Sequence, residues 1–549
     1  MSRCSSVSSK STPQVYGRVR SLGPWLLPLI LVGGLALDNG GFDATTWGWS
    51  TLLPLVVVGV ALAVGFARRP GPLALAFVAL LAGLAVWSGV SVAWSVDVSQ
   101  SVLELERLLV YVSGAAAFVM FERRDVERLL GGLVTAVAVA CVSALWLRAF
   151  GGVGSYDVAS VSPAATRRLA EPLGYSNGLG AFAAVGAVVA GSLAVARRSW
   201  LYAAALVLFL PTLYFTYSRG AWLALAAGAV GAFAVAGQSL PRRLTLAAAA
   251  AAVVVAAVAL VLVGGPAGAV HKFSRAGPAV KPGSRTRLLS LSGSSRAQYW
   301  RVAWREYEAH PLLGVGAGGF QRGWLRLRPA RLPVLDAHSL YLETLTELGP
   351  LGLALLGGTL LLPAVAALRS RGPLAAAAFG GYAVFLVHAA QDWDWELPAV
   401  TLAGIVCGAA LLLLAERHPR PDVGAGARTA GIAAAAALTL GALVALAGNE
   451  AVAAARSALD ADRAEAAARD ARWAERLAPW SSVGWRLQGE ARLSQGDVTG
   501  ARRAFEQAVR KDGGDWDAWS DLVLVTHGDA RKHAEARARR LNPLGSTGG

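Results

Sequence analysis

Apolar runs of about 18–22 residues recur through roughly the first 450 positions of the chain, and each is long enough to cross a bilayer as an α-helix. A helix satisfies its own backbone hydrogen bonds, which lipid hydrocarbon cannot do. Charged residues make up 16% of the chain and the mean hydropathy is +0.48, whereas a soluble domain carries about 25% charged residues. The runs therefore predict an all-α, polytopic membrane helix bundle of about 13 spans.

The first apolar run, 25–37, is short, and we interpret it as an uncleaved anchor because no convincing small-residue cleavage site follows it. The other predicted spans are 51–67, 72–94, 103–121, 127–149, 175–195, 200–217, 220–237, 243–264, 339–368, 373–390, 397–415 and 427–447. The last of these is Ala-rich, and its crossing decides on which side of the membrane the C-terminal region lies.

Basic residues between the spans test this topology through the positive-inside rule. They share the cytoplasmic side if the N-terminus is cytoplasmic and every span crosses once; the pairs are Arg18/Arg20, Arg68/Arg69, Arg123/Arg124, Arg197/Arg198, Arg242/Arg243, Arg369/Arg371 and Arg417/Arg420. We therefore expect a multi-pass protein of the cytoplasmic (inner) membrane with an extracytoplasmic C-terminal region.

Five domains follow from this topology. They are a cytoplasmic tail, N-terminal membrane helices, an extracytoplasmic basic loop, C-terminal membrane helices and an extracytoplasmic repeat region, at 1–20, 21–264, 265–337, 338–448 and 449–549. The net charge of +16 also suggests that cytoplasmic loops contact anionic membrane lipids.

The C-terminal region carries a weak internal repeat. Trp485 and Trp519 are 34 residues apart, the period of a tetratricopeptide repeat. Small and aromatic residues occupy the positions expected of such a repeat, namely Gly489, Ala501, Phe505 and Ala508, with Ala467, Ala474 and Pro479 in the matching positions one period earlier. Gly496-Asp497 would form the turn between the two helices. This predicts about two such repeats, which bind a protein partner rather than do chemistry. The alternative is a plain helical hairpin.

The basic loop is the most unusual segment, because it contains 12 Lys and Arg residues but only three acidic residues between Gly265 and Ala337. Basic loops normally stay cytoplasmic, so a translocated one needs another reason. Binding an anionic substrate at the membrane surface is the reason we favour. Nucleic-acid binding is the weaker interpretation, since no basic helix or aromatic-basic module stands apart from the spans, and we expect no nucleic-acid partner.

Several polar residues fall on the expected outer face beside this loop. Arg219 lies in a very short turn between two spans, where a guanidinium can grip phosphate oxygens or simply pin a helix end. Arg168 and Asn177 flank the start of another span. Asn177 could hydrogen-bond a sugar or a diphosphate, or could cap the helix.

His338 begins a span directly after the basic loop and could take a proton from a hydroxyl nucleophile. Asp336 could orient it, although a histidine at a helix start is often structural. Glu343 and Glu347 follow on one helix face, and charges inside a span are usually functional.

A second polar run lies between two later spans and contains His388, Asp392, Asp394 and Glu396 beside two tryptophans. The tryptophans fit an interfacial aromatic belt. We interpret the acids first as an ion-pair scaffold for the loop arginines, and second as a sugar or acceptor subsite. Neither a nucleotide-type phosphate loop nor a zinc-ligand spacing is present in the sequence. We therefore expect no cofactor and no metal.

The ordered set of these residues resembles the O-antigen ligase/polymerase-like family of membrane glycosyltransferases. The resembling pieces span roughly 95–415 and are Ser218-Arg219-Gly220-Ala221, Arg296 with Trp300, His310-Pro311-Leu312 with Gly314, Gly316 and Phe320, and His338-Ser339-Leu340-Tyr341-Leu342-Glu343 with Glu347 and Gly349. Arg219 and Leu223 also match the Arg-x-x-x-Leu signature of the ligases. Ten residues separate His338 from Gly349, one more than is usual in ligases, so ligation and polymerisation both stay open.

This resemblance implies a membrane glycosyltransferase C-type fold and a metal-independent glycosyltransferase of cell-surface polysaccharide assembly. The donor would be a polyprenyl-diphosphate-linked glycan, and the acceptor a hydroxyl of a glycan, lipid or protein. The implied catalytic residues are His338, Arg219 and Arg296, and the implied substrate-binding residues are Asn177, Arg168, Arg301, Arg287, Glu343, His388 and Asp392. Two other interpretations are a flippase or transporter of lipid-linked glycans and a membrane scaffold that presents the repeats.

Overall fold

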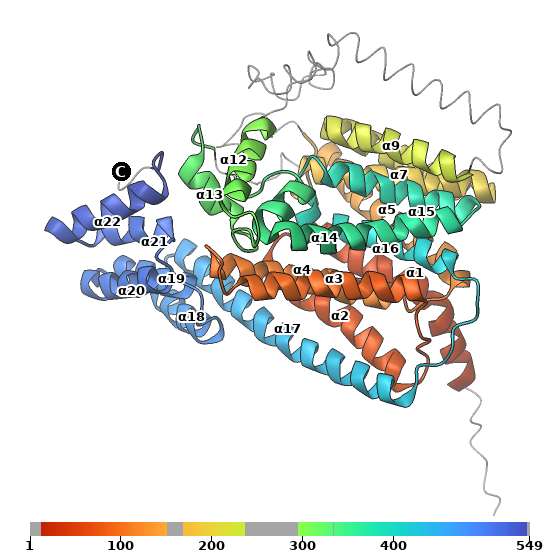
Figure 1. Ribbon diagram of the computed structural model, residues 1–549, viewed down its shortest axis with the longest axis horizontal. Helices are drawn as coiled ribbons and strands as arrows, with labels where there is room; N and C mark the ends of the chain where they lie inside the picture. The colour runs from red at the N-terminus through yellow and green to blue at the C-terminus, as the bar shows by residue number, and fades with distance from the viewer. Residues whose placement is uncertain (1–11, 151–167, 237–294, 333, 546–549) are drawn as a thin grey trace, which may run out of the picture.

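The computed structural model describes residues 12–150, 168–236, 295–332 and 334–545, with side chains from residue 22 onward (Figure 1). The regular elements in these ranges are helices, apart from one isolated β-bridge between Arg68 and Asp422. The membrane part contains α1 (Thr12–Leu37), α2 (Ala44–Ala63), α3 (Pro72–Ser91), α4 (Val98–Phe118), α5 (Val126–Phe150), α7 (Ser176–Arg197), α8 (Trp200–Thr216), α9 (Arg219–Ala236), α14 (Leu340–Arg369), α15 (Pro373–Ala389), α16 (Pro398–Ala415) and α17 (Ala425–Asp460).

The described part of the basic loop, from residue 295 onward, contributes α12 (Arg296–Ala309) and α13 (Phe320–Leu327). The C-terminal tail is formed by α18 (Ala464–Leu477), α19 (Val483–Ser494), α20 (Val498–Lys511), α21 (Trp516–Leu524) and α22 (Gly528–Leu541). Short 3₁₀ turns connect the membrane helices at Asn39–Gly41 (η1), Arg123–Asp125 (η2) and Asp394–Glu396 (η5). The all-α prediction is confirmed for the described residues.

Among the described residues, eight helices are long and apolar enough to cross a membrane, namely α2, α3, α5 with η2, α7, α9, α14, α16 and α17. The apolar parts of α1, α8 and α15 are shorter, and α4 carries Glu104, Glu106 and Arg107 within its 21 residues. Multiple membrane spans are thus present, but the count of 13 is not confirmed. The predicted span 243–264 lies outside the described residues.

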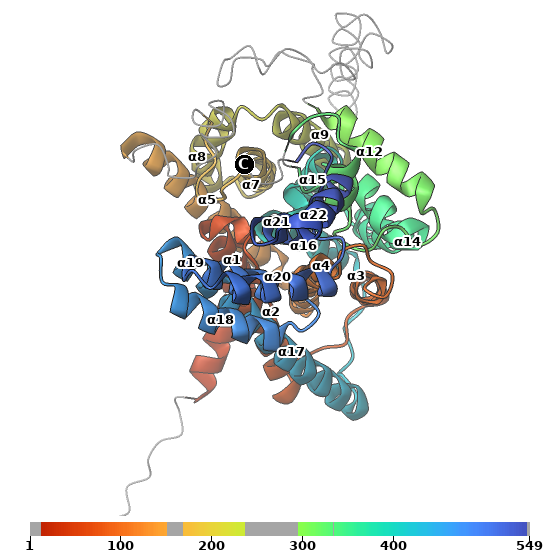
Figure 2. The same ribbon diagram turned by 90° about the vertical axis from the view of Figure 1, so that its left-hand side faces the viewer.

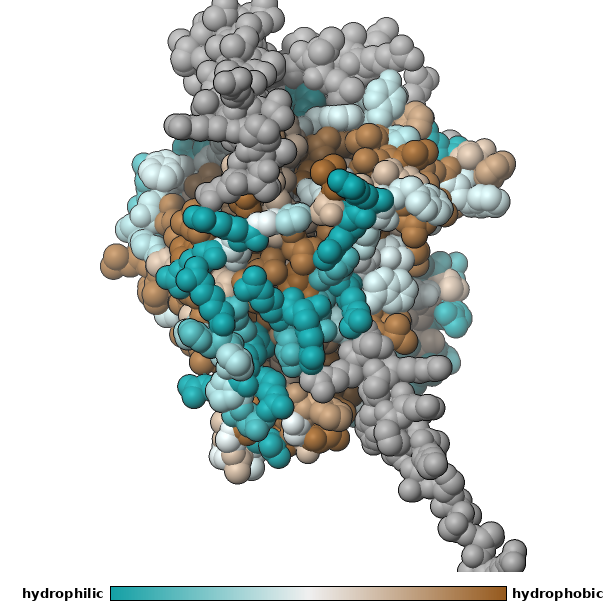
Figure 3. Space-filling model, turned by 90° about the vertical axis from the view of Figure 1, so that its right-hand side faces the viewer, coloured by the Kyte–Doolittle hydropathy of each residue, from teal (hydrophilic) through white to brown (hydrophobic). Residues whose placement is uncertain are grey.

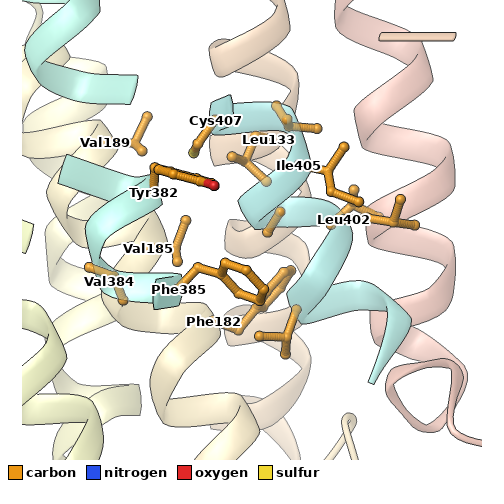
Figure 4. Packing of buried hydrophobic residues seen from close by; sticks show 14 of the residues in the cluster. Leu133, Phe182, Val185, Val189, Tyr382, Val384, Phe385, Leu402, Ile405 and Cys407 are labelled. Atoms are coloured by element: carbon orange, nitrogen blue, oxygen red, sulfur yellow. The ribbon is translucent and has the colours of Figure 1, made fainter. Parts of the chain in front are cut away.

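The core of the bundle forms around α16, nearly all of whose side chains are buried. Figure 4 shows Phe182 of α7 beside Phe385 of α15 in this core, with Leu402 on α16 nearby in the same cluster. Gly404 makes this approach possible, because a Cβ on it would lie 2.6 Å from the Phe385 ring. Small residues let membrane helices pack closely in this way. By contrast, α17 is mostly exposed, as expected for a helix that faces lipid.

One end of the bundle gathers basic residues, and Figure 3 shows a hydrophilic group at this end. Arg420 donates to the carbonyls of Val119 and Phe121 at 2.8 and 2.9 Å and pairs with Glu416. Arg68 pairs with Asp422 at the same end. The structure therefore brings several of the arginines of the predicted cytoplasmic loops together.

The helix α14 is broken at Gly349, whose φ is 65°, and Pro350 follows it. Pro350 has no amide hydrogen, so the Thr346 carbonyl lacks its helical donor. The loop before α13 supplies replacements, since Val315 N donates to Thr346 O at 3.1 Å and Gly316 N donates to Glu347 O at 2.9 Å. The Glu347 carboxylate then accepts from two further amides of the loop, at 2.8 and 3.0 Å. Glu347 therefore anchors the basic loop to α14.

The tail helices lie at the same end of the bundle as α12 and α13 (Figures 1 and 2). Arg322 of α13 connects these parts: its Nε donates to Asp97 before α4 at 2.8 Å, and its other nitrogens contact Asp512 and the Gly514 carbonyl. Arg328 donates to Asn542 of the tail at 2.7 Å. The predicted boundary at 448/449 falls inside α17, which runs unbroken from the membrane part into the tail.

Within the tail, Gly496-Asp497 forms the turn between α19 and α20 as predicted, with Asp497 accepting the Gly500 amide at 2.8 Å. Ala501, Phe505 and Ala508 are buried in the contact between the helices. The packing of α19 on α20 depends on Gly489, because a Cβ there would lie 2.3 Å from the Phe505 ring.

We expect Gly489→Ala to destabilise the tail by about 1–3 kcal/mol, the usual cost of overpacking a filled core. Thermal unfolding of the full chain in detergent, with proteolysis of the tail as the readout, would measure this loss of stability. Gly496→Ala would be a poor control, since φ at Gly496 is 77°. Ser494→Ala, at the end of the same helix, is better suited. Equal proteolytic resistance of wild type and Gly489→Ala would contradict the packing argument.

Candidate active site

Five segments bring polar side chains to the end of the bundle that carries α12 and α13 (Figure 1). They are the start of α7, the α8–α9 turn, the start of α12, the residues before α14 and the α15–α16 connection. The chain alternates direction through the bundle, so helix ends that are far apart in sequence meet at one level. Glycines of α7 help, because a Cβ on Gly180 would lie 2.9 Å from both the Thr216 hydroxyl and the Ala221 side chain.

Asp392 is the hub of this site, and only 1% of its side chain is exposed. Arg296 Nη2 donates to its carboxylate at 2.6 Å, and Asn177 Nδ2 and the Tyr175 hydroxyl each donate at 2.7 Å. Burial alone would raise the pKa of Asp392, but the adjacent Arg296 guanidinium outweighs it and holds the pKa well below its usual range. The carboxylate is therefore ionised, and the predicted pairing of this acidic run with a loop arginine is present.

Arg168 extends the network on the far side of Asn177. Its Nε donates to the Thr216 carbonyl at 2.7 Å, and its Nη2 donates to the side-chain oxygen of Asn177. Asn177 therefore has both ends of its amide occupied, between an arginine and an aspartate. It sits in the first turn of α7, but its amide connects the two ionic groups and does not cap the helix.

His338 stands between the Arg296–Asp392 pair and a group of buried acids. Its backbone has a φ of 57°, a left-handed conformation that is uncommon for residues other than glycine. Its ring lies 4.9 Å from the Tyr299 ring, and Nδ1 is 3.1 Å from the Asp336 carbonyl. A carbonyl can only accept, so Nδ1 carries the hydrogen and Nε2 keeps its lone pair. Burial, partly offset by Asp392, lowers the pKa of His338 and favours the neutral ring.

Arg219 is the first residue of α9 and is half-buried. The turn before it contains Tyr217 in a left-handed conformation, and the Ser218 hydroxyl accepts the Ala221 amide at 3.3 Å. Gln391, in the α15–α16 connection, donates to the Gly220 carbonyl at 3.4 Å. This places the start of α9 directly beside the connection that carries Asp392.

His388 lies in the last turn of α15 and forms a pair with Asp394, with Nδ1 at 2.9 Å from the carboxylate. Both side chains are almost fully buried, at 1% and 2% exposed. The sequence singled out His388 but not its partnership with Asp394.

A buried acidic group lies on the other side of His338. Oxygens of Asp336, Glu343 and Glu396 fall within 4.8 Å of one another, so these residues could together hold a metal ion. Glu343 also accepts the Ala337 amide at 2.7 Å. Burial and the neighbouring Glu396 raise the pKa of Asp336 well above its usual range, which favours its protonated form. The expectation of no metal remains a prediction.

Arg107 of α4 balances part of this charge. It donates to Glu396 at 2.9 Å and also contacts Glu104, and its side chain is 3% exposed. Sequence reasoning missed Arg107 and Glu104, although three charged residues in one apolar span were a usable signal. It also missed Tyr175, which looks like an ordinary interfacial aromatic residue in the sequence.

An apolar cavity opens beside the acids between α3, α4, α14, α15 and α16. Its walls include Phe77, Leu81, Leu356 and Ile405, and Glu343 is among its polar lining residues. A site with cations on one side and an apolar cavity on the other suits an amphipathic substrate.

Two predicted residues are not part of this network. Arg301 is exposed on α12 and forms no ion pair with any residue whose placement is described. Arg287 lies outside the described residues. Of the three neighbouring arginines considered for the site, Arg296 is therefore the one that the structure brings to Asp392.

Two comparisons with known proteins bear on the family of this chain. Residues 204–357 match the family model described as O-Antigen ligase, a range that contains Arg219, Arg296 and His338. A TPR repeat-containing protein of Pseudomonas aeruginosa is 36% identical over 77 residues, 14% of this chain. The aligned segment spans 62% of that relative's length. The chain is thus a multi-pass membrane protein with a segment similar to the O-antigen ligase family, and its C-terminal region resembles a TPR repeat-containing protein.

Proposed function

We propose that this protein transfers a glycan from a polyprenyl-diphosphate donor to an acceptor hydroxyl at the outer face of the cytoplasmic membrane. The match of residues 204–357 to the O-antigen ligase family supports lipid-linked glycan transfer in surface polysaccharide assembly. The observation that carries the finer proposal is the site around Asp392, where Arg296 and Arg168 lie beside the start of α9 and close to a neutral histidine. Cations for a leaving diphosphate and a base for a hydroxyl are what this reaction requires.

In the proposed mechanism, Arg219 and Arg296 stabilise the diphosphate as it gains negative charge. The acceptor oxygen forms a bond to the anomeric carbon while the bond from that carbon to the phosphate oxygen breaks, with inversion. The hydroxyl proton passes to Nε2 of His338, whose Nδ1–H donates to the Asp336 carbonyl. The bonding pair leaves with the diphosphate, so charge and protons balance. Asp392 holds Arg296 in place and remains ionised.

Further parts of the proposal concern the membrane. We propose 13 spans in a glycosyltransferase C-type arrangement, with a cytoplasmic N-terminus and the tail outside. The gathered arginines at one end and the site with the tail at the other support this orientation, since basic ends stay cytoplasmic. The acceptor is a hydroxyl of a glycan, lipid or protein, and the tail binds a protein partner or the growing glycan.

The experiment that tests this function uses the purified protein in nanodiscs with a polyprenyl-diphosphate glycan and candidate acceptors. We expect transfer that persists in EDTA, and the length of the product separates polymerisation from ligation. Loss of transfer in EDTA, restored by a divalent ion, would contradict metal independence and point to Asp336, Glu343 and Glu396. If glycan is transferred to none of the candidate acceptors, the proposal is overturned.

The pH dependence of transfer follows from the lowered pKa of His338. A neutral imidazole is the working base, so transfer should be constant above neutral pH and fall as the ring takes up a proton. The midpoint of the fall should lie below 6.5, the usual value for histidine. Transfer rates measured from pH 5 to 9 check this. His338→Gln is the control, because its residual rate should not show the fall at acidic pH. A midpoint above 6.5 would contradict the assignment.

A further inference from the structure

The pair formed by His388 and Asp394 has one atom that the proposed mechanism does not use. Nδ1 of His388 faces the Asp394 carboxylate at 2.9 Å. Nε2 is buried and has no hydrogen-bond partner in the described part of the chain. A buried polar atom without a partner is costly, so it marks a place where a ligand is expected.

Nε2 faces the first turn of α9. A Cβ on Gly220 would lie 3.3 Å from Nε2 of His388 and 3.1 Å from Nε2 of Gln391. Gly220 therefore keeps open the space between α15 and α9. The first amides of a helix have no acceptor within it, and at the start of α9 the Ser218 hydroxyl accepts the Ala221 amide. The amides at the start of α9 and the imidazole of His388 thus converge.

The chemistry of this place suits an anion. The start of an 18-residue helix carries a partial positive charge and binds phosphate groups readily. Arg219 occupies the same turn. With Asp394 at Nδ1 and an anion at Nε2, the imidazolium would donate to a negative group from both nitrogens. An apolar group would leave Nε2 without a hydrogen-bond partner.

We propose that His388, oriented by Asp394, binds a phosphoryl oxygen of the donor's diphosphate at the start of α9. This inference rests on the proposed function and deepens it, since it assigns one phosphoryl contact to a residue outside the range matched by the family model. His388 donates a hydrogen bond in this role and transfers no proton, so His338 remains the base. Asp394 acts through His388 as a positioning residue.

The test measures the affinity of the full chain in nanodiscs for polyprenyl diphosphate. We expect His388→Gln to weaken binding about tenfold to a hundredfold, the range for a lost charge-assisted hydrogen bond. Affinity of the wild type should fall as pH rises and the imidazolium loses its proton, and this dependence should be absent in His388→Gln. The charged groups that act on His388 are Asp394, Asp392 and Arg296. Arg219 begins the helix that Nε2 of His388 faces, and His388→Gln leaves all four charged groups in place.

Asp394→Asn is a second, independent test in case His388→Gln does not fold. It keeps the size of the side chain and removes the charge that favours the imidazolium. It should weaken binding in the same direction, with acceptor KM unchanged. His418→Gln is the matched control, an exposed histidine beyond the opposite end of α16. Its affinity should equal that of the wild type.

The outcomes separate the two proposals. If the wild type transfers glycan and Arg296→Ala does not, but His388→Gln and Asp394→Asn both bind polyprenyl diphosphate as the wild type does, the role of His388 is overturned alone. If the wild type neither transfers glycan nor binds polyprenyl diphosphate, the proposed function fails and this inference falls with it.

Discussion

His338→Gln is expected to reduce glycan transfer by about 10²–10⁴-fold, the usual contribution of a general base. The variant keeps a polar side chain at a position with a φ of 57°, but glutamine cannot accept the hydroxyl proton. Donor binding should change little, because the cations that hold the diphosphate remain. The loss should therefore appear in kcat rather than in the KM for the donor. Single-turnover transfer in nanodiscs measures it.

His310→Gln is the matched control for this prediction. His310 is exposed at the end of α12, and its Nδ1 lies 3.3 Å from the Glu306 carbonyl of that helix. Its transfer rate should match that of the wild type. Retention of more than a tenth of the wild-type rate in His338→Gln would show that another group accepts the proton.

Arg296→Ala is the second change with a large expected effect. Loss of a group that stabilises developing charge lowers kcat by about 10²–10³-fold. This variant also leaves the Asp392 carboxylate, 1% exposed, without its guanidinium. Breaking such a buried pair costs about 3–5 kcal/mol of stability, so inactivity alone would be ambiguous.

The double variant Arg296→Ala/Asp392→Asn resolves this ambiguity. Asparagine removes the unpaired charge and keeps contacts to Asn177 and Tyr175, so much of the lost thermal stability should return. Transfer should remain low, because no cation faces the diphosphate at this position. Arg301→Ala, an exposed arginine of the same helix, should behave as the wild type. Recovery of transfer with stability would reduce Arg296 to a structural role.

Much of the fold could be predicted from the sequence, because the bilayer imposes length and hydrophobicity on each helix. The predicted ranges 72–94 and 397–415 correspond to α3 and α16 within a few residues. The two helices of the basic loop were not predicted. Their positions depend on long-range contacts, such as Glu347 holding the amides of residues 318 and 320, and no local period encodes such contacts.

The site was predictable as a set of residue types at one membrane face, but its pairings were not. Arg296 and Arg301 are five positions apart in similar surroundings, and only the fold distinguishes the buried partner of Asp392 from the exposed arginine. The partnership of Arg107 with Glu396 joins α4 to η5 across almost the whole membrane part of the sequence. Likewise, the approach of Gly220 to Nε2 of His388 is apparent only in the structure.

The measurement that tests the central proposal most directly counts two products in proteoliposomes that carry the donor and an acceptor. We predict one polyprenyl diphosphate released for each glycan transferred, with both lost in His338→Gln. The contradicting result is lipid-linked glycan that crosses the vesicle membrane intact, without release of polyprenyl diphosphate. That outcome would make the protein a transporter, and the Asp392 site its substrate-binding site.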